Sequence, residues 1–254
     1  MLKALWTRLK QRHRTLPFPG PEPLLSARYR GRLVFDAAKC QSNCRCCEEP
    51  CSTGALSFTI NQHQLRHDLG RCLFCGDCAN ACATGALKFS REFRLATQTR
   101  ESLITDGKTL ELARTLEAKL LKLYGRSLKL RQVSAAGCNA CEADVNVLNT
   151  VVFDLSRFGI QFVASPRHAD GLLITGPVSV NMKLALEKTY AALPPPRLVI
   201  AVGACAISGG PYAGRSEVCN GVANIVPVNL FVPGCPPHPL TILDGLLRLL
   251  GKAD

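Results

Sequence analysis

The sequence lacks an apolar run long enough to cross a membrane. Its apolar stretches are broken by Gly, Pro or charged residues, whereas a spanning helix needs about 20 predominantly apolar residues in a row. The basic N-terminus contains no apolar core followed by a small-residue cleavage site, so we expect no secretory signal. Aromatic residues make up only 6% of the chain and no nucleic-acid-binding motif occurs, so we expect no nucleic-acid partner despite a net charge of +12.

Catalytic and nucleotide-binding signatures are also missing. The chain has only 5 His, and none combines with Ser, Asp or Cys in a set that indicates nucleophilic catalysis. The glycine-rich segment 203–210 has neither the spacing of a dinucleotide-binding loop nor the Lys of a P-loop. We therefore expect no nicotinamide or flavin site and no substrate chemistry in this chain alone.

Cysteine, by contrast, is abundant. Nine of the 14 Cys lie between residues 40 and 82, and the other five lie beyond residue 137. In a chain without an export signal, clustered Cys indicates metal or redox chemistry rather than disulfides. A length of 254 residues is typical of two modest domains. We expect a basic N-terminal helix with a Pro-rich linker, a nine-cysteine domain, a helical connector and a C-terminal domain, at residues 1–32, 33–90, 91–126 and 127–254.

The nine-cysteine domain contains an internal repeat. Its second run has the spacing C-x2-C-x2-C-x3-C, in which three thiolates bind one [4Fe–4S] cube and the fourth serves a neighbouring cube. The first run repeats this pattern imperfectly as C-x3-C-x2-C-x3-C, and Thr-Gly-Ala-Leu follows each run, at residues 53–56 and 84–87. The runs consist of Cys40, Cys44, Cys46, Cys47 and Cys51, and of Cys72, Cys75, Cys78 and Cys82.

A zinc site is the alternative to iron–sulfur clusters here, but zinc favours C-x2-C pairs about a dozen residues apart rather than packed groups of four. The domain resembles a bacterial-type two-cluster ferredoxin, although Ser52 and Ala83 replace the Pro that usually follows the fourth Cys. The resemblance implies crossed ligation by Cys40, Cys44, Cys47 and Cys82 on one cluster, and by Cys72, Cys75, Cys78 and Cys51 on the other. Cys46 could replace Cys44, and the irregular first run leaves an altered or absent first cluster open.

The C-terminal domain alternates short apolar strands with helices. This pattern is typical of a parallel sheet covered on both faces, whose sites form in loops beyond the carboxyl ends of the strands. Three such loops contain Cys138 with Cys141, Cys205 and Cys235, which together could hold one [4Fe–4S] cube. The expected strands are 128–133, 160–164, 171–175, 198–202 and 229–232, and the expected helices are 143–158, 181–192 and 239–250.

Residues 130–250 resemble the electron-transfer small subunit of group 4 membrane-bound [NiFe] hydrogenases, of the formate hydrogenlyase type, and the homologous complex I B subunit. The resemblance depends on Leu-Ile-Thr-Gly-Pro-Val at 173–178 and Val-Pro-Gly-Cys-Pro-Pro at 232–237. It implies a flavodoxin-like α/β domain, preceded here by a small α+β ferredoxin domain, and a third cluster on Cys138, Cys141, Cys205 and Cys235.

Several residues near this third set of ligands leave alternatives open. The C-x2-C spacing favours the hydrogenase branch, because complex I B subunits carry two adjacent cysteines there. Glu142 and Asp144 could relay protons or could be solvated surface residues. Cys219 fits no ligand position, and we expect it to be structural.

The N-terminal and connector segments carry simpler patterns. Leu2, Leu5, Trp6 and Leu9 share one face of a basic helix, which could lie on an anionic membrane, dock on a partner or be solvated. A Pro-rich linker, with Pro at residues 17, 19, 21 and 23, follows in an extended conformation. A leucine stripe at residues 112, 116, 120 and 123 predicts a helix from about Gly107 to Tyr124.

We therefore expect a natural fusion of a two-cluster ferredoxin with a hydrogenase-type small subunit. It would relay electrons through three [4Fe–4S] clusters to or from the active site of a partner large subunit, which would hold the nickel. Membrane-arm subunits and an electron donor or acceptor protein would complete a peripheral complex on the cytoplasmic side of the membrane. The alternatives are a complex I-like NADH- or ferredoxin-quinone oxidoreductase subunit and a non-catalytic iron–sulfur scaffold.

Overall fold

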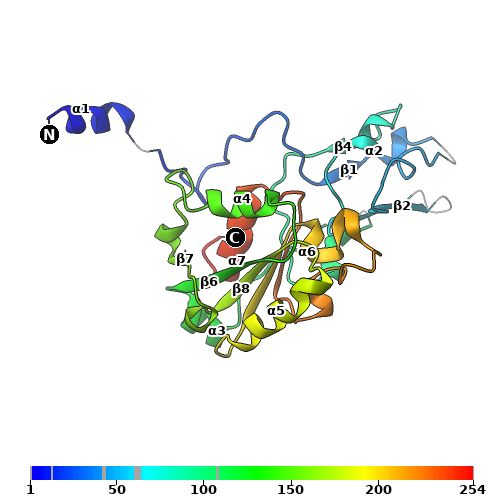
Figure 1. Ribbon diagram of the computed structural model, residues 1–254. Coiled ribbons are helices and arrows are strands. Elements are labelled where there is room, and N and C mark those ends of the chain that lie inside the picture. The colour runs from blue at the N-terminus through cyan, green and yellow to red at the C-terminus, as the bar shows by residue number, and fades with distance from the viewer. Residues whose placement is uncertain (1, 13, 42–43, 60–63, 107–108, 254) are drawn as a thin grey trace.

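The chain folds into a cysteine-rich part and an α/β domain, with a helix projecting from the N-terminal end (Figure 1). The structure is a computed structural model that describes residues 2–12, 14–41, 44–59, 64–106 and 109–253. None of the helices among these residues is both long and apolar enough to span a membrane.

The α/β domain is built on a five-stranded parallel sheet with the strand order β10-β9-β8-β6-β7. Counted in chain order within the sheet, this is the doubly wound order 2-1-3-4-5, in which connections leave in opposite directions on either side of one switch point. The expected α/β domain with a parallel sheet is confirmed. The strands are β6 (Leu128–Ser134), β7 (Ile160–Phe162), β8 (Gly171–Thr175), β9 (Leu198–Val202) and β10 (Leu230–Val232).

Both faces of this sheet are covered at its centre, which explains the uninterrupted apolar sequence of β8, β9 and β10. One core joins Leu173 and Ile200 to the helices α4 and α7, and the other joins Leu172 and Val199 to α5 and α6. The central strands β8 and β9 are buried over their whole length. The covering helices are α4 (Ala140–Val147), α5 (Val180–Ala191), α6 (Ala204–Ser208) and α7 (Pro239–Leu249), and short 3-10 turns cover Leu155–Phe158, Pro166–His168, Gly210–Tyr212 and Val222–Asn224.

The helix expected at 143–158 is shorter than the sequence suggested. The helix α4 begins three residues earlier and ends at Val147, and a separate 3-10 turn covers Leu155–Phe158. Between them Asp154 has a φ of 46°, a left-handed conformation that a continuous helix cannot contain. The apolar residues of α4 and of the 3-10 turn pack in the same core, so their helical spacing in the sequence does not require one continuous helix.

The connector differs more strongly from expectation. The helix α3 covers only Ala118–Tyr124 and ends at Gly125, whereas residues 109–117 contain no helix and residues 107–108 lie outside the described part of the chain. The Ala113 and Leu116 N–H groups donate to the carbonyls of Ala96 and Leu249. The first half of the leucine stripe therefore packs as irregular chain against the α/β domain instead of forming a helix.

The cysteine-rich part contains two small antiparallel sheets. In one, β1 (Leu33–Phe35) pairs with β4 (Leu87–Phe89), and in the other β3 lies between β2 and β5. Each Thr-Gly-Ala-Leu word leads directly into a strand, since its Leu is the first residue of β2 or of β4. The remaining elements are β2 (Leu56–Thr59), β3 (Gln64–Asp68), β5 (Ile104–Thr105), α2 (Asp77–Asn80) and the 3-10 turns Ala37–Lys39 and Glu101–Leu103.

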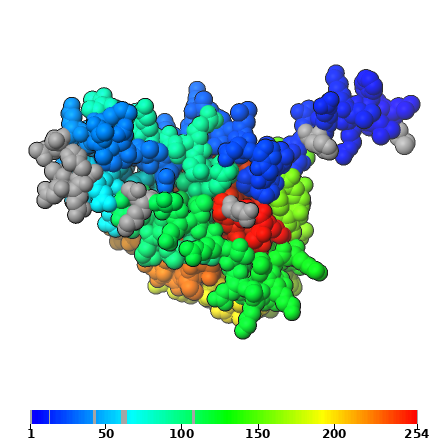
Figure 2. Space-filling view, turned by 180° about the vertical axis from the view of Figure 1, so that it is seen from behind, coloured from blue at the N-terminus to red at the C-terminus, as the bar shows by residue number. Residues whose placement is uncertain are grey.

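The N-terminal helix α1 (Leu2–Gln11) has no buried residue and lies away from the body of the molecule in both views (Figures 1 and 2). The linker that follows is anchored rather than loose. The Leu16 N–H donates to the Val152 carbonyl, Arg157 donates to the Leu16 and Phe18 carbonyls, and Phe18 is buried in the first core. The point at which α1 leaves the body is therefore fixed.

Candidate iron–sulfur cluster sites

The cysteines expected for the first cluster surround one cavity of about 210 Å³, which we call the first site. Its wall includes Phe35 and Leu87 from the paired strands β1 and β4. Burial and the neighbouring Cys44 and Cys82 thiols raise the pKa of Cys40. The sulfur atoms of Cys44 and Cys46 are 3.1 Å apart, so the structure leaves open which of them would be a ligand. The thiols of the first site belong to Cys40, Cys44, Cys46, Cys47 and Cys82.

A second cavity, the second site, is lined by Cys51, Cys72, Cys75 and Cys78. Cys72 and Cys78 are buried, whereas Cys75 is exposed. Burial raises the pKa of Cys72 to about 12, against a hydrogen bond from the Phe74 N–H that lowers it. A buried thiol of this kind ionises only where a positive centre compensates for the lost hydration.

The repeated Thr-Gly-Ala-Leu word forms a turn just after the last cysteine of each run, and the turn hydrogen-bonds back to that cysteine. The Ala55 N–H donates to Cys51 Sγ at 3.2 Å, and the Gly54 N–H donates to the Cys51 carbonyl at 3.0 Å. In the second copy, Gly85 donates to the Cys82 carbonyl at the same distance.

Both glycines of the repeated word have positive φ, 59° for Gly54 and 65° for Gly85, which is the conformation that favours glycine. In the second copy, residues of this turn act on the Cys82 thiol. Burial raises the pKa of Cys82, but hydrogen bonds from Thr84, Leu87 and Ala86 outweigh that effect, so the pKa is lowered. The sequence revealed the repeat, and the structure gives its role.

The third site lies beyond the carboxyl ends of three parallel strands. Cys138 and Cys141 follow β6, Cys205 follows β9 and Cys235 follows β10. Burial, with Cys235 and Cys138 nearby, raises the pKa of Cys205 to about 11. Burial and the Cys205 and Cys235 thiols raise that of Cys141 as well. Cys138 and Cys235 are exposed, so this site opens toward the surface.

Two of the acidic and thiol groups near the third site have structural explanations. Glu142 is buried and accepts hydrogen bonds from Ser134 and Thr175, each at 2.6 Å, so the alternative of a solvated surface residue was wrong. It ties α4 to the ends of β6 and β8. Cys219 is partly buried against the second core and its N–H donates to the Val178 carbonyl, which fits a structural residue.

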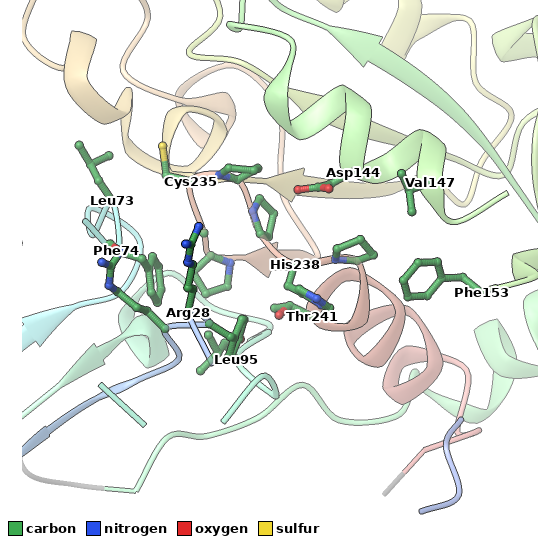
Figure 3. Close-up of a pocket in the computed structure, with 17 residues that line it drawn as sticks. Arg28, Leu73, Phe74, Leu95, Asp144, Val147, Phe153, Cys235, His238 and Thr241 are labelled. Carbon is green, nitrogen blue, oxygen red and sulfur yellow. The ribbon is translucent and has the colours of Figure 1, made fainter. Parts of the chain in front are cut away.

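A cavity of about 460 Å³ lies beside the third site (Figure 3). Cys235 and Asp144 border it from the α/β domain, and Leu73 and Phe74, from the loop between Cys72 and Cys75, border it from the cysteine-rich part. Burial raises the pKa of Asp144. The cavity therefore lies where the second and third sites meet.

The donor set fits polynuclear iron–sulfur groups. Within the described ranges, no three His, Cys, Asp or Glu side chains converge closely enough to hold one metal ion. At the first and second sites the thiols instead line the walls of cavities, and backbone N–H groups donate to the sulfurs of Cys51 and Cys72. Such N–H···S contacts are characteristic of cluster ligands.

Comparisons with known proteins relate mainly to the α/β domain. Residues 138–249 match the family described as NADH ubiquinone oxidoreductase, 20 Kd subunit, a range that contains the third site but not the first and second. The chain is 40% identical over 140 residues to formate hydrogenlyase subunit 7 of Escherichia coli K12, which covers 55% of this chain and 55% of that protein.

Two further relatives have the same identity over shorter stretches. The probable membrane-bound hydrogenase subunit mbhJ of Pyrococcus furiosus is 40% identical over 53% of this chain and 81% of that protein. The B subunit of the NADH-quinone oxidoreductase of Heliobacterium modesticaldum is 40% identical over 46% of this chain and 68% of that protein.

Proposed function

Because this chain belongs to the family of the 20 kDa subunit of NADH–ubiquinone oxidoreductase, we propose that it relays electrons through three [4Fe–4S] clusters to or from the active site of a partner large subunit. Its relatives are named as subunits of formate hydrogenlyase, membrane-bound hydrogenase and NADH-quinone oxidoreductase, so the expected assignment as a subunit of an oxidoreductase complex is confirmed. The complex in our proposal is a membrane-associated [NiFe] hydrogenase of the formate hydrogenlyase type.

The observation that carries this proposal is that the second and third sites adjoin. The loop between Cys72 and Cys75 of the second site lines one cavity with Cys235 of the third site, and burial, Cys138 and Cys75 raise the pKa of Cys235. Electrons can then enter through the cysteine-rich part and reach the α/β domain within one chain. Among the described residues that line this cavity, Leu73 and Phe74 come from the loop of the second-site thiols, and none comes from residues 40–47 or 81–84 around the first site, which supports the order first, second, third.

The junction between the two parts is packed and hydrogen-bonded. Leu69 is completely buried in the second core of the α/β domain. Ser208, at the end of α6, donates from Oγ to the Gly70 carbonyl at 2.9 Å. Arg100 pairs with Asp68 at 2.6 Å. These contacts lie just before Cys72 in the sequence, so they hold the second site in a fixed position relative to the third.

The chain itself supplies thiolates, burial and N–H donors. The clusters would supply the one-electron chemistry. The Ala55 and Phe74 N–H groups stabilise negative charge on the sulfurs of Cys51 and Cys72. Burial of Cys141 and Cys205 keeps water from one side of the third site, while exposed Cys138 and Cys235 face the surface that a large subunit would cover.

A quinone-reducing complex is the second candidate, because one relative of equal identity is a subunit of NADH-quinone oxidoreductase. The C-x2-C spacing of Cys138 and Cys141 favours the hydrogenase branch. In the hydrogenase case the large subunit carries nickel ligands, and in the quinone case it does not.

Purification of the native complex distinguishes these candidates. We expect a large subunit with nickel to copurify, and we expect the clusters of the complex to be reduced under H2, as followed by their EPR signals. A copurifying large subunit without nickel, together with reduction by quinol but not by H2, would contradict the hydrogenase assignment and favour the second candidate.

We propose further that α1 docks this subunit on an anionic membrane surface. Its apolar side chains Leu2, Trp6 and Leu9 are 84%, 70% and 73% exposed, and the helix contains three basic and no acidic residues. Apolar side chains enter the headgroup region while Lys and Arg bind anionic lipid. Figure 2 shows α1 standing clear of the body, so the helix can reach a flat surface.

A further inference from the structure

A buried histidine of the cysteine-rich part has no hydrogen-bonding partner. His67, on β3, is 3% exposed, and within the described part of the chain neither ring nitrogen makes a hydrogen bond. Buried polar groups are almost always satisfied, so an orphaned imidazole indicates a missing partner. The backbone of His67 is well fixed, because it pairs with Leu56 and Thr105 and its carbonyl accepts a hydrogen bond from Thr105 Oγ1.

His67 lines the cavity of the second site together with the four thiols. The remaining wall includes Leu56 and Phe89, whose side chains carry no hydrogen-bonding atoms, and the hydroxyl-bearing Ser52 and Thr53, neither of which makes a hydrogen bond with the His67 ring in the described part of the chain. The acceptors that a bound cluster would bring to this cavity are sulfur atoms. Burial lowers the pKa of His67 to about 4, so the imidazole is neutral near pH 7 and carries one N–H donor.

The internal repeat shows that this histidine makes the two halves unequal. In the second half of the repeat, Leu87 pairs with Phe35, which lines the first site. In the first half, the equivalent Leu56 pairs with His67, which lines the second site. Phe35 at the first site and His67 at the second site therefore occupy equivalent positions in the two halves of the repeat.

We propose that His67 donates its ring N–H to a sulfur atom of the second cluster and makes that cluster easier to reduce than the first. This inference rests on the proposed function, because it requires a cluster at the second site. A donor to cluster sulfur withdraws electron density and stabilises the reduced form. Because the histidine N–H is present only at the second site, it would favour the reduced state of the cluster that adjoins the third site.

The direct test replaces His67 by the residue of the equivalent position. In a His67→Phe variant of the cluster-loaded full chain, we expect the reduced fraction of the second cluster at a fixed solution potential to fall severalfold. The reduced fraction of the first cluster should stay unchanged. Redox titration followed by EPR measures both, and a Cys72→Ala variant identifies the signal of the second cluster. Pulsed EPR in H2O and D2O should show, besides the couplings of backbone N–H groups, one further exchangeable-proton coupling in the wild type that is absent from His67→Phe.

Two further variants keep the test decisive. A His67→Gln variant retains an N–H donor and should restore part of the reduction. If His67→Phe loses its cluster, a His67→Leu variant, which is smaller and also lacks a donor, replaces it as the test. The reciprocal Phe35→His variant should make the first cluster easier to reduce. If His67→Phe leaves both the reduction and the proton coupling of the second cluster unchanged, the inference is wrong while the relay stands. A wild-type chain with no cluster at the second site contradicts both.

Discussion

At the scale of single residues, the third site depends on thiols that pack against bare backbone. Gly203 has a φ of +91°, and a Cβ there would lie 2.5 Å from Cys141 Sγ. Gly210 has a φ of +55°, and its Cβ would lie 2.8 Å from Cys205 Sγ. Both glycines therefore make room for the sulfur atoms of the expected ligands.

We predict that Gly203→Ala empties the third site without affecting the other two. The added methyl group must displace Cys141 Sγ, so the chain should lose about four irons, the content of one cluster. Metal analysis and EPR of the reduced protein check this. Gly214→Ala is the matched control, since Gly214 also has a positive φ of +81° but no atom lies within 4 Å of its Cβ position. Equal iron loss in both variants would show that backbone strain, not contact with sulfur, is responsible.

Single residues also show where sequence reasoning ends. The repeated spacing favours Cys44 over Cys46, but their sulfurs are 3.1 Å apart, so the geometry does not choose between them. His67 gave no signal at all, because a lone His in a strand matches no motif and its significance depends on burial beside thiols. The cysteine spacing was informative because it follows from the shape of a cluster, which is a local property.

At the scale of elements, burial decides which parts of the sequence pattern were reliable. The strands at 171–175 and 198–202 appear with the expected bounds, because continuous apolar residues in a strand require burial on both faces. The helix expected from residue 107 appears only from Ala118, because Ala113 and Leu116 hydrogen-bond to chain segments that are distant in sequence. A leucine stripe does not distinguish a helix from irregular chain held by such contacts.

The helix α7 contains a buried ion pair that gives an element-scale prediction. Asp244 and Arg248 are 1% and 8% exposed, and their charged atoms are 2.8 Å apart. Replacing Arg248 by Met should cost about 3–5 kcal/mol at neutral pH, because it removes the ion-pair partner of a buried carboxylate. The double variant Asp244→Leu/Arg248→Met should regain most of that stability. Denaturant unfolding of the three proteins measures these differences.

The pH dependence of the Arg248→Met variant has a definite sign. Burial already raises the pKa of Asp244, even though Arg248 lowers it, and removal of Arg248 raises it further. A carboxyl whose pKa is higher in the folded than in the unfolded state binds its proton more tightly when folded, so acid stabilises the fold. The stability loss should therefore be largest above the raised pKa and should shrink as the pH falls through it. A loss that grows toward acid would contradict this account.

At the scale of the whole molecule, the chain combines a cysteine-rich part, a fixed junction with the α/β domain and a projecting N-terminal helix. The cysteine-rich part meets the α/β domain where Leu73, Phe74 and Cys235 line one cavity, and α1 leaves from the linker that is anchored at Leu16. This arrangement could not be read from sequence, because it depends on contacts such as Ser208 with Gly70, which are 138 positions apart.

Removal of residues 1–14 should abolish binding to vesicles that contain anionic lipid, while iron content and EPR spectra remain those of the full chain. Vesicle cosedimentation measures binding, and vesicles of neutral lipid are the control. Added salt should weaken the binding, because Lys and Arg contribute through electrostatic attraction. A Trp6→Glu variant should lose binding without truncation. Unchanged binding after truncation would exclude α1 as the membrane contact.

The central claim is that the thiols of this chain hold three clusters in series, and metal and sulfide analysis combined with EPR tests it most directly. In the full chain, purified without oxygen and reduced, we expect about twelve irons and as many acid-labile sulfides, with magnetic coupling between the second and third clusters. Protein that carries zinc without sulfide, or only four irons confined to the third site, would contradict the claim.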